Sequence, residues 1–213
     1  MMKQVRHLFW DFDGTLFDSY PELSGSFMRG LESLGLGGII EMPQLMQLIK
    51  KYLGTAAQYC AEKSGVEKET IMNAFRHFHA LPHEDPPYEG LADCLKRLHD
   101  AGYHHYLYTH SKQSAVDQLI RENLWQYFDD AVLGSDGFPL KPAPDALLAL
   151  MERNNLTPDV CAMIGDRDID VLAGHNAGMK GILFDPEGYF PDFHAELDVR
   201  SMKELADSLL NEQ

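Results

Sequence analysis

The stretch VRHLFWDFDGTL, residues 5–16, decides the fold because a short apolar run there delivers two carboxylates onto a glycine-containing turn. Residues 5–10 read as a buried strand, and Asp11 stands at its C-terminal end, where open α/β sheets bind their ligands. Asp13 follows two positions later and can face the same cleft. Like charges this close repel each other, so the pair predicts a relieving cation such as Mg²⁺, or a shared proton. Taken alone, the same string also fits a solvated turn.

Three later segments place further polar groups at the ends of strand-like or helix-starting segments. Thr109 follows an aromatic run, Lys141 precedes a helix start fixed by prolines, and a third apolar run closes on an acidic stretch that contains Asp166 and Asp170. Apolar runs of strand length alternate with helix-length segments throughout this part of the chain. This alternation is typical of a parallel sheet flanked by helices.

These four strings, in this order and with helix-sized gaps, resemble the motifs of the haloacid dehalogenase superfamily, and the resemblance spans the whole chain. Within that superfamily, residues 11–19 and 165–179 are most similar to phosphoglycolate phosphatase-type hydrolases. The resemblance implies a first motif at Asp11 and Asp13, a second at Thr109, a third at Lys141 and a fourth at Asp166 with Asp170.

The resemblance also implies a role for each group, and each role answers a need of phosphoryl transfer. Asp11 is the expected nucleophile, and Asp13 is expected to protonate the leaving oxygen and then to activate water. Thr109 and Lys141 are expected to bind the phosphate by a hydrogen bond and by charge. The backbone amide of His110 is expected at the phosphate too, while a contact between its ring and the substrate stays open.

The expected cofactor is Mg²⁺, which prefers oxygen ligands and keeps several of its waters. The resemblance implies Asp11, Asp13 and Asp166 as its ligands. Asp170 lies one helical turn beyond Asp166, so we expect it to orient ligands or waters from just behind them. An alternative for the acidic run is stabilisation of a helix N-terminus, and it suits Asp168 best.

The fold class expected is α/β, a Rossmann-like three-layer core with a parallel sheet and an all-helical cap inserted after the first strand. The insert resembles the helical cap of the superfamily's first subclass, although a helical subdomain without a moving part remains an alternative. The expected boundaries are 1–16 and 85–213 for the core and 17–84 for the cap. Predicted helices of the insert cover 21–34, 43–53, 55–64 and 67–80. Those of the core cover 90–102, 112–123, 144–154, 168–176 and 202–210, with strands at 103–108, 131–133, 160–164 and 181–184.

Composition excludes several classes of function. The 18 basic and 33 acidic residues give a formal charge of −15, which disfavours nucleic acid as a partner. No targeting segment or membrane-length apolar run is apparent, so we expect a cytoplasmic protein without membrane contact. The three cysteines lack paired spacing and read as reduced core thiols. The expected partner is a small phosphorylated metabolite, and the expected assembly is a monomer or homodimer.

Two further patterns bear on metal binding and specificity. His77, His79 and His83 look like a metal cluster, but His77 and His79 should point to different sides of a helix and no acid has helical spacing to both, which disfavours a metal there. Sugar-phosphate mutases of the superfamily place cations around the cap glycine that Gly54 resembles. Leu53 and Ala57 stand at those places here.

The expected function is therefore Mg²⁺-dependent hydrolysis of a small phosphate monoester, of the phosphoglycolate or sugar-phosphate type, through an aspartyl-phosphate. The missing cap cation also weakens the case for phosphoglycolate as the substrate, because its carboxylate should require a positive charge. Arg29, Lys50 or Lys51 could supply that charge from elsewhere. Two alternatives remain: a phosphomutase similar to β-phosphoglucomutase, and a non-catalytic phosphate-binding regulatory protein.

Overall fold

The computed structural model describes residues 2–81 and 83–211. The chain separates into two compact units, one formed by Met1–Phe17 with Pro87–Gln213 and the other by Asp18–Pro86. These boundaries lie one and two residues from those expected from the sequence. The two crossings between the units run side by side. Phe17 pairs with Pro87 in an isolated β-bridge, and the Asp18 amide donates to the Pro86 carbonyl at 2.9 Å.

In the described part of the chain, the first unit contains one sheet of six strands in the order β3-β2-β1-β4-β5-β6. Every strand pair is parallel, which confirms the predicted α/β class. The order reverses on either side of β1, and open sheets of this kind bind ligands beyond the carboxyl ends of the strands at such a point. The strands are β1 His7–Trp10, β2 His104–Tyr108, β3 Phe128–Val132, β4 Cys161–Gly165, β5 Lys180–Phe184 and β6 Leu197–Val199.

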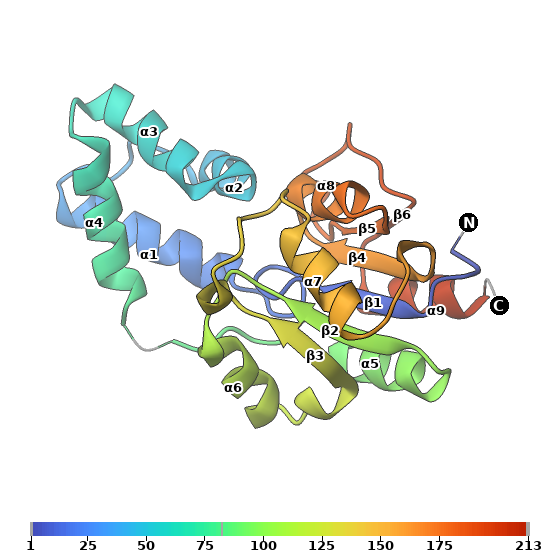
Figure 1. The fold of residues 1–213 in the computed structure, drawn as a ribbon. Coiled ribbons are helices and arrows are strands. Elements are labelled where there is room, and N and C mark those ends of the chain that lie inside the picture. Colours follow the sequence, from blue (N-terminus) through green and yellow to red (C-terminus); the bar gives the residue numbers. More distant parts are fainter. Residues whose placement is uncertain (1, 82, 212–213) are drawn as a thin grey trace. The chain divides into compact units, whose positions relative to one another are not determined.

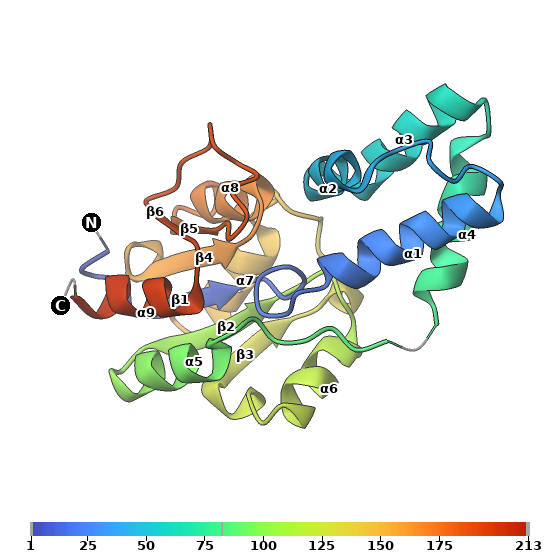
Figure 2. The same ribbon diagram turned by 180° about the vertical axis from the view of Figure 1, so that it is seen from behind.

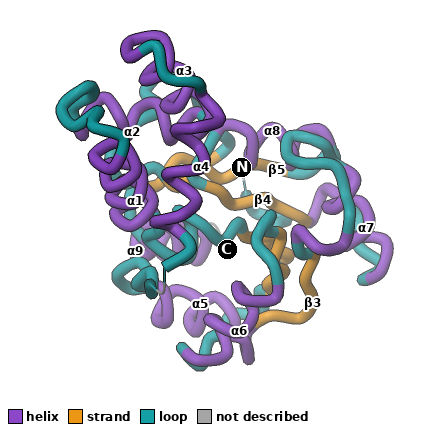
Figure 3. Tube along the Cα trace, turned by 90° about the vertical axis from the view of Figure 1, so that its left-hand side faces the viewer, coloured by secondary structure: helices purple, strands orange, loops and turns teal. Residues whose placement is uncertain are grey.

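Helices cover both faces of this sheet because successive side chains of a strand point to opposite faces. Leu8 and Trp10 belong to an apolar cluster with residues of α5, α6 and α9, whereas Phe9 belongs to a second cluster with residues of α7 and α8. Figure 1 shows α7 and α8 in front of the sheet, and the reverse view in Figure 2 brings α5 and α9 to the front. Figure 3 distinguishes the strands from these helices by colour. The helices are α5 Leu91–Asp100, α6 Gln113–Arg121, α7 Asp145–Arg153, α8 Asp168–Asn176 and α9 Met202–Asn211.

The second unit is helical, as its apolar periodicity predicts, and has a core of its own. Phe27, Leu45 and Phe75 are among the buried residues of this core. Helices α1 and α4 approach closely at Gly30, where a Cβ atom would lie 2.9 Å from the backbone nitrogen of Phe75. The helices are α1 Tyr20–Ser33, α2 Met42–Lys51, α3 Leu53–Ser64 and α4 Lys68–His79, each within two residues of its predicted bounds.

The differences from the predicted elements are local. Strand β3 begins at Phe128, three residues before the predicted start, and β6 was not predicted because its three residues include the exposed Asp198. All three cysteines are free and buried, as expected. None of the helices found within 2–81 and 83–211 combines the length and the apolar character that crossing a membrane requires.

Candidate active site

Three neighbouring strands end at the same edge of the sheet and deliver the first polar groups of the site. Asp11 directly follows β1, and its backbone amide donates to the carbonyl of Ile164 at 2.9 Å. Thr109 follows β2, and Asp166 follows β4. Because β1 pairs with both β2 and β4, the side chains of Asp11, Thr109 and Asp166 all start from adjacent backbone positions. All three residues are buried.

The turn after Asp11 is closed by glycine and by Thr15. Gly14 has a positive φ of 82°, a conformation that glycine adopts without steric cost, and its amide donates to the Phe17 carbonyl at 2.8 Å. The Thr15 hydroxyl donates to Asp166 Oδ1 at 3.4 Å. The first motif is therefore tied to the fourth by a side-chain hydrogen bond.

Lys141 stands at the centre of the site. Its ammonium group lies 2.5 Å from Asp11 Oδ1 and 2.9 Å from Asp170 Oδ1, and it donates to the Tyr108 carbonyl at 3.1 Å. Asp11 and the Tyr108 carbonyl accept hydrogen bonds from the ammonium, and Asp170 forms an ion pair with it. The Lys141 side chain has no solvent exposure, so the residue is not the surface lysine that composition alone would favour.

Burial and charge set the ionisation of this pair. Burial alone would lower the pKa of Lys141, but the carboxylates of Asp11 and Asp170 raise it overall, so this lysine stays charged. Burial raises the pKa of Asp11 to about 7 although Lys141 opposes the shift, and the nearby Asp170 and Asp166 add to it. The site therefore contains more negative charge than Lys141 neutralises.

Asp13 differs from Asp11 in its surroundings. Solvent reaches Asp13, and its Oδ2 accepts a hydrogen bond of 2.6 Å from the Ser111 hydroxyl. Desolvation by the surrounding protein atoms raises the pKa of Asp13, while the Ser111 hydrogen bond acts in the opposite direction. Ser111 thus fixes the orientation of this carboxyl group.

A cluster of three buried carboxylates could hold a metal ion. One oxygen each from Asp11, Asp166 and Asp170 lies within 4.8 Å of the others. Asp170 is held there from behind, since the Arg167 amide donates to its Oδ2 at 3.1 Å. The Asp170 side chain also needs the glycine at 165, where an added Cβ would come within 2.1 Å of Asp170 Cβ.

This cluster differs in one member from the ligand set implied by the sequence resemblance. Asp170 joins Asp11 and Asp166, and Asp13 is outside the group. Asp168 has a different role, because its carboxylate accepts from the Ile169 amide at 2.8 Å at the start of α8. This contact agrees with the helix-terminus interpretation of Asp168.

The side chains of the second motif accept hydrogen bonds from backbone amides, one within the motif and one at Lys141. Thr109 Oγ1 accepts from the Ser111 amide at 2.9 Å, which leaves the hydroxyl proton for another acceptor. His110 Nε2 accepts from the Lys141 amide at 3.2 Å. Burial, followed by the charge of Lys141, lowers the pKa of His110 to about 4, so the ring is neutral and this nitrogen keeps its lone pair.

Sequence reasoning missed two contributors, Ser111 and the Tyr108 carbonyl. Ser111 stands in the same strand-end string as Thr109 and could have been found as a second hydroxyl at that end. The Tyr108 carbonyl carries no residue-specific signal. The loop that contains His110 packs closely against Gly134, where an added Cβ atom would lie 2.0 Å from the His110 carbonyl oxygen.

Comparisons with known proteins show the family to which the chain is similar. Residues 8–184 match the family model described as haloacid dehalogenase-like hydrolase. A phosphoglycolate phosphatase of Psychrobacter arcticus is 32% identical over 195 residues, covering 84% of this chain and 82% of its own. One from Vibrio vulnificus is 30% identical, covering 83% and 82%. A crystal structure titled as a predicted phosphoglycolate phosphatase from Haemophilus somnus shares the fold, with a TM-score of 0.77, 19% identity and 99% coverage of both chains.

Proposed function

The chain belongs to the haloacid dehalogenase-like hydrolases and is a phosphatase of the phosphoglycolate phosphatase-like group, and on that premise we propose that it hydrolyses a small phosphate monoester through a phosphorylated Asp11. The observation that carries the proposal is the buried contact between Lys141 and Asp11 at the end of β1, with Asp13 two residues away. A protein that only bound phosphate would not need this pair of acids.

In the first step, a carboxylate oxygen of Asp11 attacks phosphorus and the bond from phosphorus to the substrate oxygen breaks. Lys141 opposes the burial-driven rise in the pKa of Asp11, which favours its ionised form, and lowers the charge repulsion that the incoming phosphate meets. Asp13 gives its proton to the departing oxygen. The raised pKa of Asp13 supports this role, because an acid catalyst must carry a proton before the reaction.

In the second step, Asp13 is a carboxylate and takes a proton from water. The water oxygen attacks phosphorus, the bond between phosphorus and the Asp11 oxygen breaks, and phosphate leaves with Asp11 restored. The Ser111 hydroxyl keeps Asp13 oriented in both steps. The hydroxyl of Thr109 and the backbone amide of His110 are the proposed donors to the phosphoryl oxygens.

A divalent cation fits the acidic cluster. Asp11 and Asp170 contact the one ammonium group, and Asp166 adds a third buried carboxylate within 4.8 Å of them, so acidic groups outnumber basic groups in this buried cluster. We propose Mg²⁺, bound by Asp11 and Asp166 with Asp13 or Asp170 as a further contributor. When bound, Mg²⁺ supplies positive charge to the phosphoryl group during its transfer.

For the leaving group we propose a small metabolite of the phosphoglycolate or sugar-phosphate type. The relatives' names make phosphoglycolate the first compound to test. In the helical unit, Lys50 is buried with its ammonium 3.9 Å from the Tyr20 ring centroid, and Arg29 pairs with Glu22. Lys51 is exposed and is the remaining candidate cation among the three that the sequence offered.

Phosphate release tests the proposal. Wild-type protein should release phosphate from a panel of phosphoglycolate, hexose 6-phosphates and glucose 1-phosphate when Mg²⁺ is present, and Lys141→Met, which keeps much of the side-chain volume, should not. Interconversion of sugar phosphates without phosphate release would instead identify a mutase. Full activity of Lys141→Met would overturn the proposed mechanism.

A further inference from the structure

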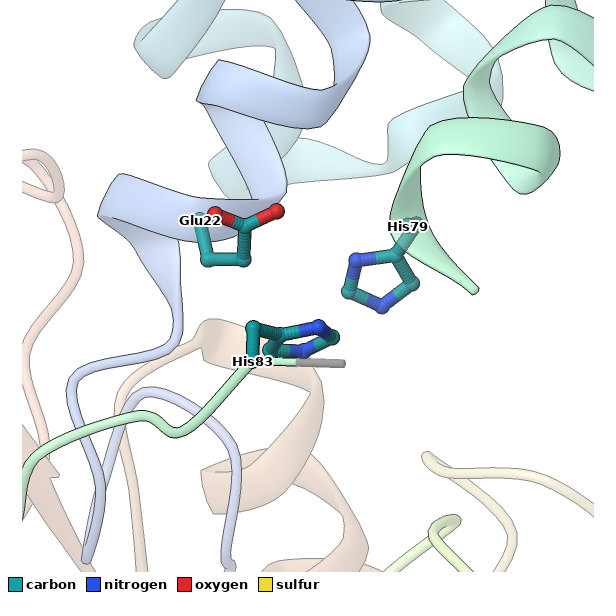
Figure 4. Close-up of side chains that lie close together, drawn as sticks. All are labelled: Glu22, His79 and His83. Atoms are coloured by element: carbon teal, nitrogen blue, oxygen red, sulfur yellow. The ribbon is translucent and has the colours of Figure 1, made fainter. Parts of the chain in front are cut away.

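We propose that Glu22, His79 and His83 form a second metal site, selective for Zn²⁺ or a similar transition-metal ion, inside the helical unit. Glu22 lies in the first turn of α1, His79 is the last residue of α4, and His83 lies in the segment that follows α4. One potential ligand atom from each residue lies within 4.8 Å of the others. Figure 4 shows the three side chains gathered in one place.

The ligand types fit zinc better than magnesium. Two imidazoles and one carboxylate are a common protein ligand set for Zn²⁺ when water takes the fourth position, whereas Mg²⁺ prefers oxygen ligands alone. Zinc–nitrogen and zinc–oxygen bonds of about 2.0–2.2 Å place tetrahedral ligand atoms roughly 3.4 Å apart. The ligand atoms, which lie within 4.8 Å of one another, therefore need to approach each other by about 1 Å. His83 is exposed, which allows this adjustment.

His83 is oriented as metal-binding imidazoles commonly are. Its Nδ1 lies 2.9 Å from the Leu81 carbonyl oxygen, and only a protonated Nδ1 makes a hydrogen bond there. This bond selects the tautomer whose Nε2 has a lone pair. Histidine ligands of metals usually donate their other ring N–H to a carbonyl or carboxylate in this way.

Glu22 is also oriented by hydrogen bonds. Its Oε1 accepts from the Ser26 hydroxyl at 2.6 Å and from Arg29. The Ser26 hydrogen bond is the largest influence on the pKa of Glu22 and lowers it. Burial opposes this change, Arg29 adds to it, and Glu22 is ionised at neutral pH. Arg29 also contributes positive charge close to the site, so an arriving metal ion must compete with it. We therefore expect a moderate affinity.

His79 is positioned by packing. Its ring stacks on Phe75 with centroids 5.1 Å apart and lies 4.8 Å from the His83 ring, tilted by 34°. His77, by contrast, meets the edge of Phe78 and is outside the group found in the described part of the chain. Helical spacing around the histidines does not reveal Glu22 as their partner, because Glu22 comes from another helix.

A metal ion at this site would tie three parts of the helical unit together. The ligands belong to the start of α1, the end of α4 and the segment that leads back toward residue 86. Because the ion would bind the folded unit and not the unfolded chain, it would stabilise the fold and hold this segment against α1. A further carboxylate oxygen, Asp85 Oδ2, lies 4.0 Å from His83 Nε2.

The test is a titration of metal-free, full-length protein with Zn²⁺ while excess Mg²⁺ occupies the core carboxylates. Calorimetry measures affinity, and ¹⁵N chemical shifts of the imidazoles identify the ligands. Wild type should bind one Zn²⁺ with shifts at His79 and His83. His83→Gln and Glu22→Gln should each weaken this binding at least tenfold. The matched control His77→Gln should bind as wild type does.

Two outcomes would overturn the proposal. One is equal Zn²⁺ affinity in wild type, His83→Gln and Glu22→Gln, and the other is Zn²⁺ binding that leaves both imidazoles unshifted. Circular dichroism of the metal-free variants checks that each one folds, which is expected because His83 is exposed. The readouts do not use phosphatase activity, so the result is independent of the reaction proposed for the core.

Discussion

Asp11 and Asp13 stand two positions apart, yet their surroundings predict different losses on substitution. Asp11→Asn removes the nucleophile and should abolish turnover of every substrate. Asp13→Asn removes only the acid and base, and should slow alkyl phosphates by roughly 10²–10⁴-fold while retaining some attack on 4-nitrophenyl phosphate, whose leaving group needs little protonation. Phosphate release from both substrate types measures this. Equal cleavage of 4-nitrophenyl phosphate by wild type and Asp11→Asn would mean that the nucleophile is wrongly assigned.

His110 provides a second prediction at the residue scale. Its Nε2 fixes the backbone of Lys141, so His110→Ala should lower kcat by about tenfold, the size typical for residues that orient a site from behind. His110→Gln restores an acceptor and should recover most of the loss. Steady-state kinetics separate kcat from KM. A rise in KM alone, unrelieved by Gln, would instead indicate that the ring contacts the substrate.

Strand β2 carries a buried histidine whose titration affects stability. His105 Nδ1 accepts from Trp10 Nε1 at 2.9 Å, and burial lowers the pKa of His105 to about 3 from its ordinary value of 6.5. Below pH 6.5 the unfolded chain takes up a proton that the folded chain does not. This one residue therefore makes the free energy of unfolding fall as pH drops from 6.5 toward 3, by up to about 1.4 kcal/mol per pH unit.

Urea unfolding at pH 7 and pH 5 checks this prediction. His105→Gln keeps a possible acceptor for Trp10 but cannot titrate. The loss of stability between pH 7 and pH 5 should be smaller in His105→Gln than in wild type by about 2 kcal/mol. The comparison cancels the contributions of the aspartates, which titrate in both proteins. An identical pH dependence in the two proteins would contradict the low pKa.

The sequence predicts elements well where apolar runs or helical periodicity are long, as in α1 to α4 and the central strands. The sequence predicts elements and contacts less well where they depend on the pairing of strands or on contacts between distant segments. Strand β6 forms because it can pair with β5, although one of its three residues is exposed. Likewise, helical spacing predicts Asp170 near the site, but it cannot reveal the ion pair that Asp170 forms with Lys141 of another segment. The contacts of Ser111 and His110 need the folded loops in the same way.

At the scale of the whole molecule, bound metal should affect stability as well as activity. A ligand that binds only the folded chain adds about 2.7 kcal/mol of stability at 100 times its dissociation constant. Mg²⁺ should thus raise the Tm of the wild type, and Asp166→Asn should reduce this rise. Ca²⁺ can also raise Tm but should not support turnover, because its larger and more variable coordination misplaces Asp11. Thermal unfolding and phosphate release with each ion test this, and equal turnover with Ca²⁺ would contradict it.

The paired crossings at residues 17–18 and 86–87 have an evolutionary consequence. The helical unit leaves and re-enters the core through two neighbouring backbone segments joined by a β-bridge and a hydrogen bond of 2.9 Å. An exchange of everything between them would keep the same pair of junctions and leave every strand of the sheet in its order. Recombination at these two points can therefore exchange the whole helical unit while every strand of the core, and each residue at the strand ends, is inherited unchanged.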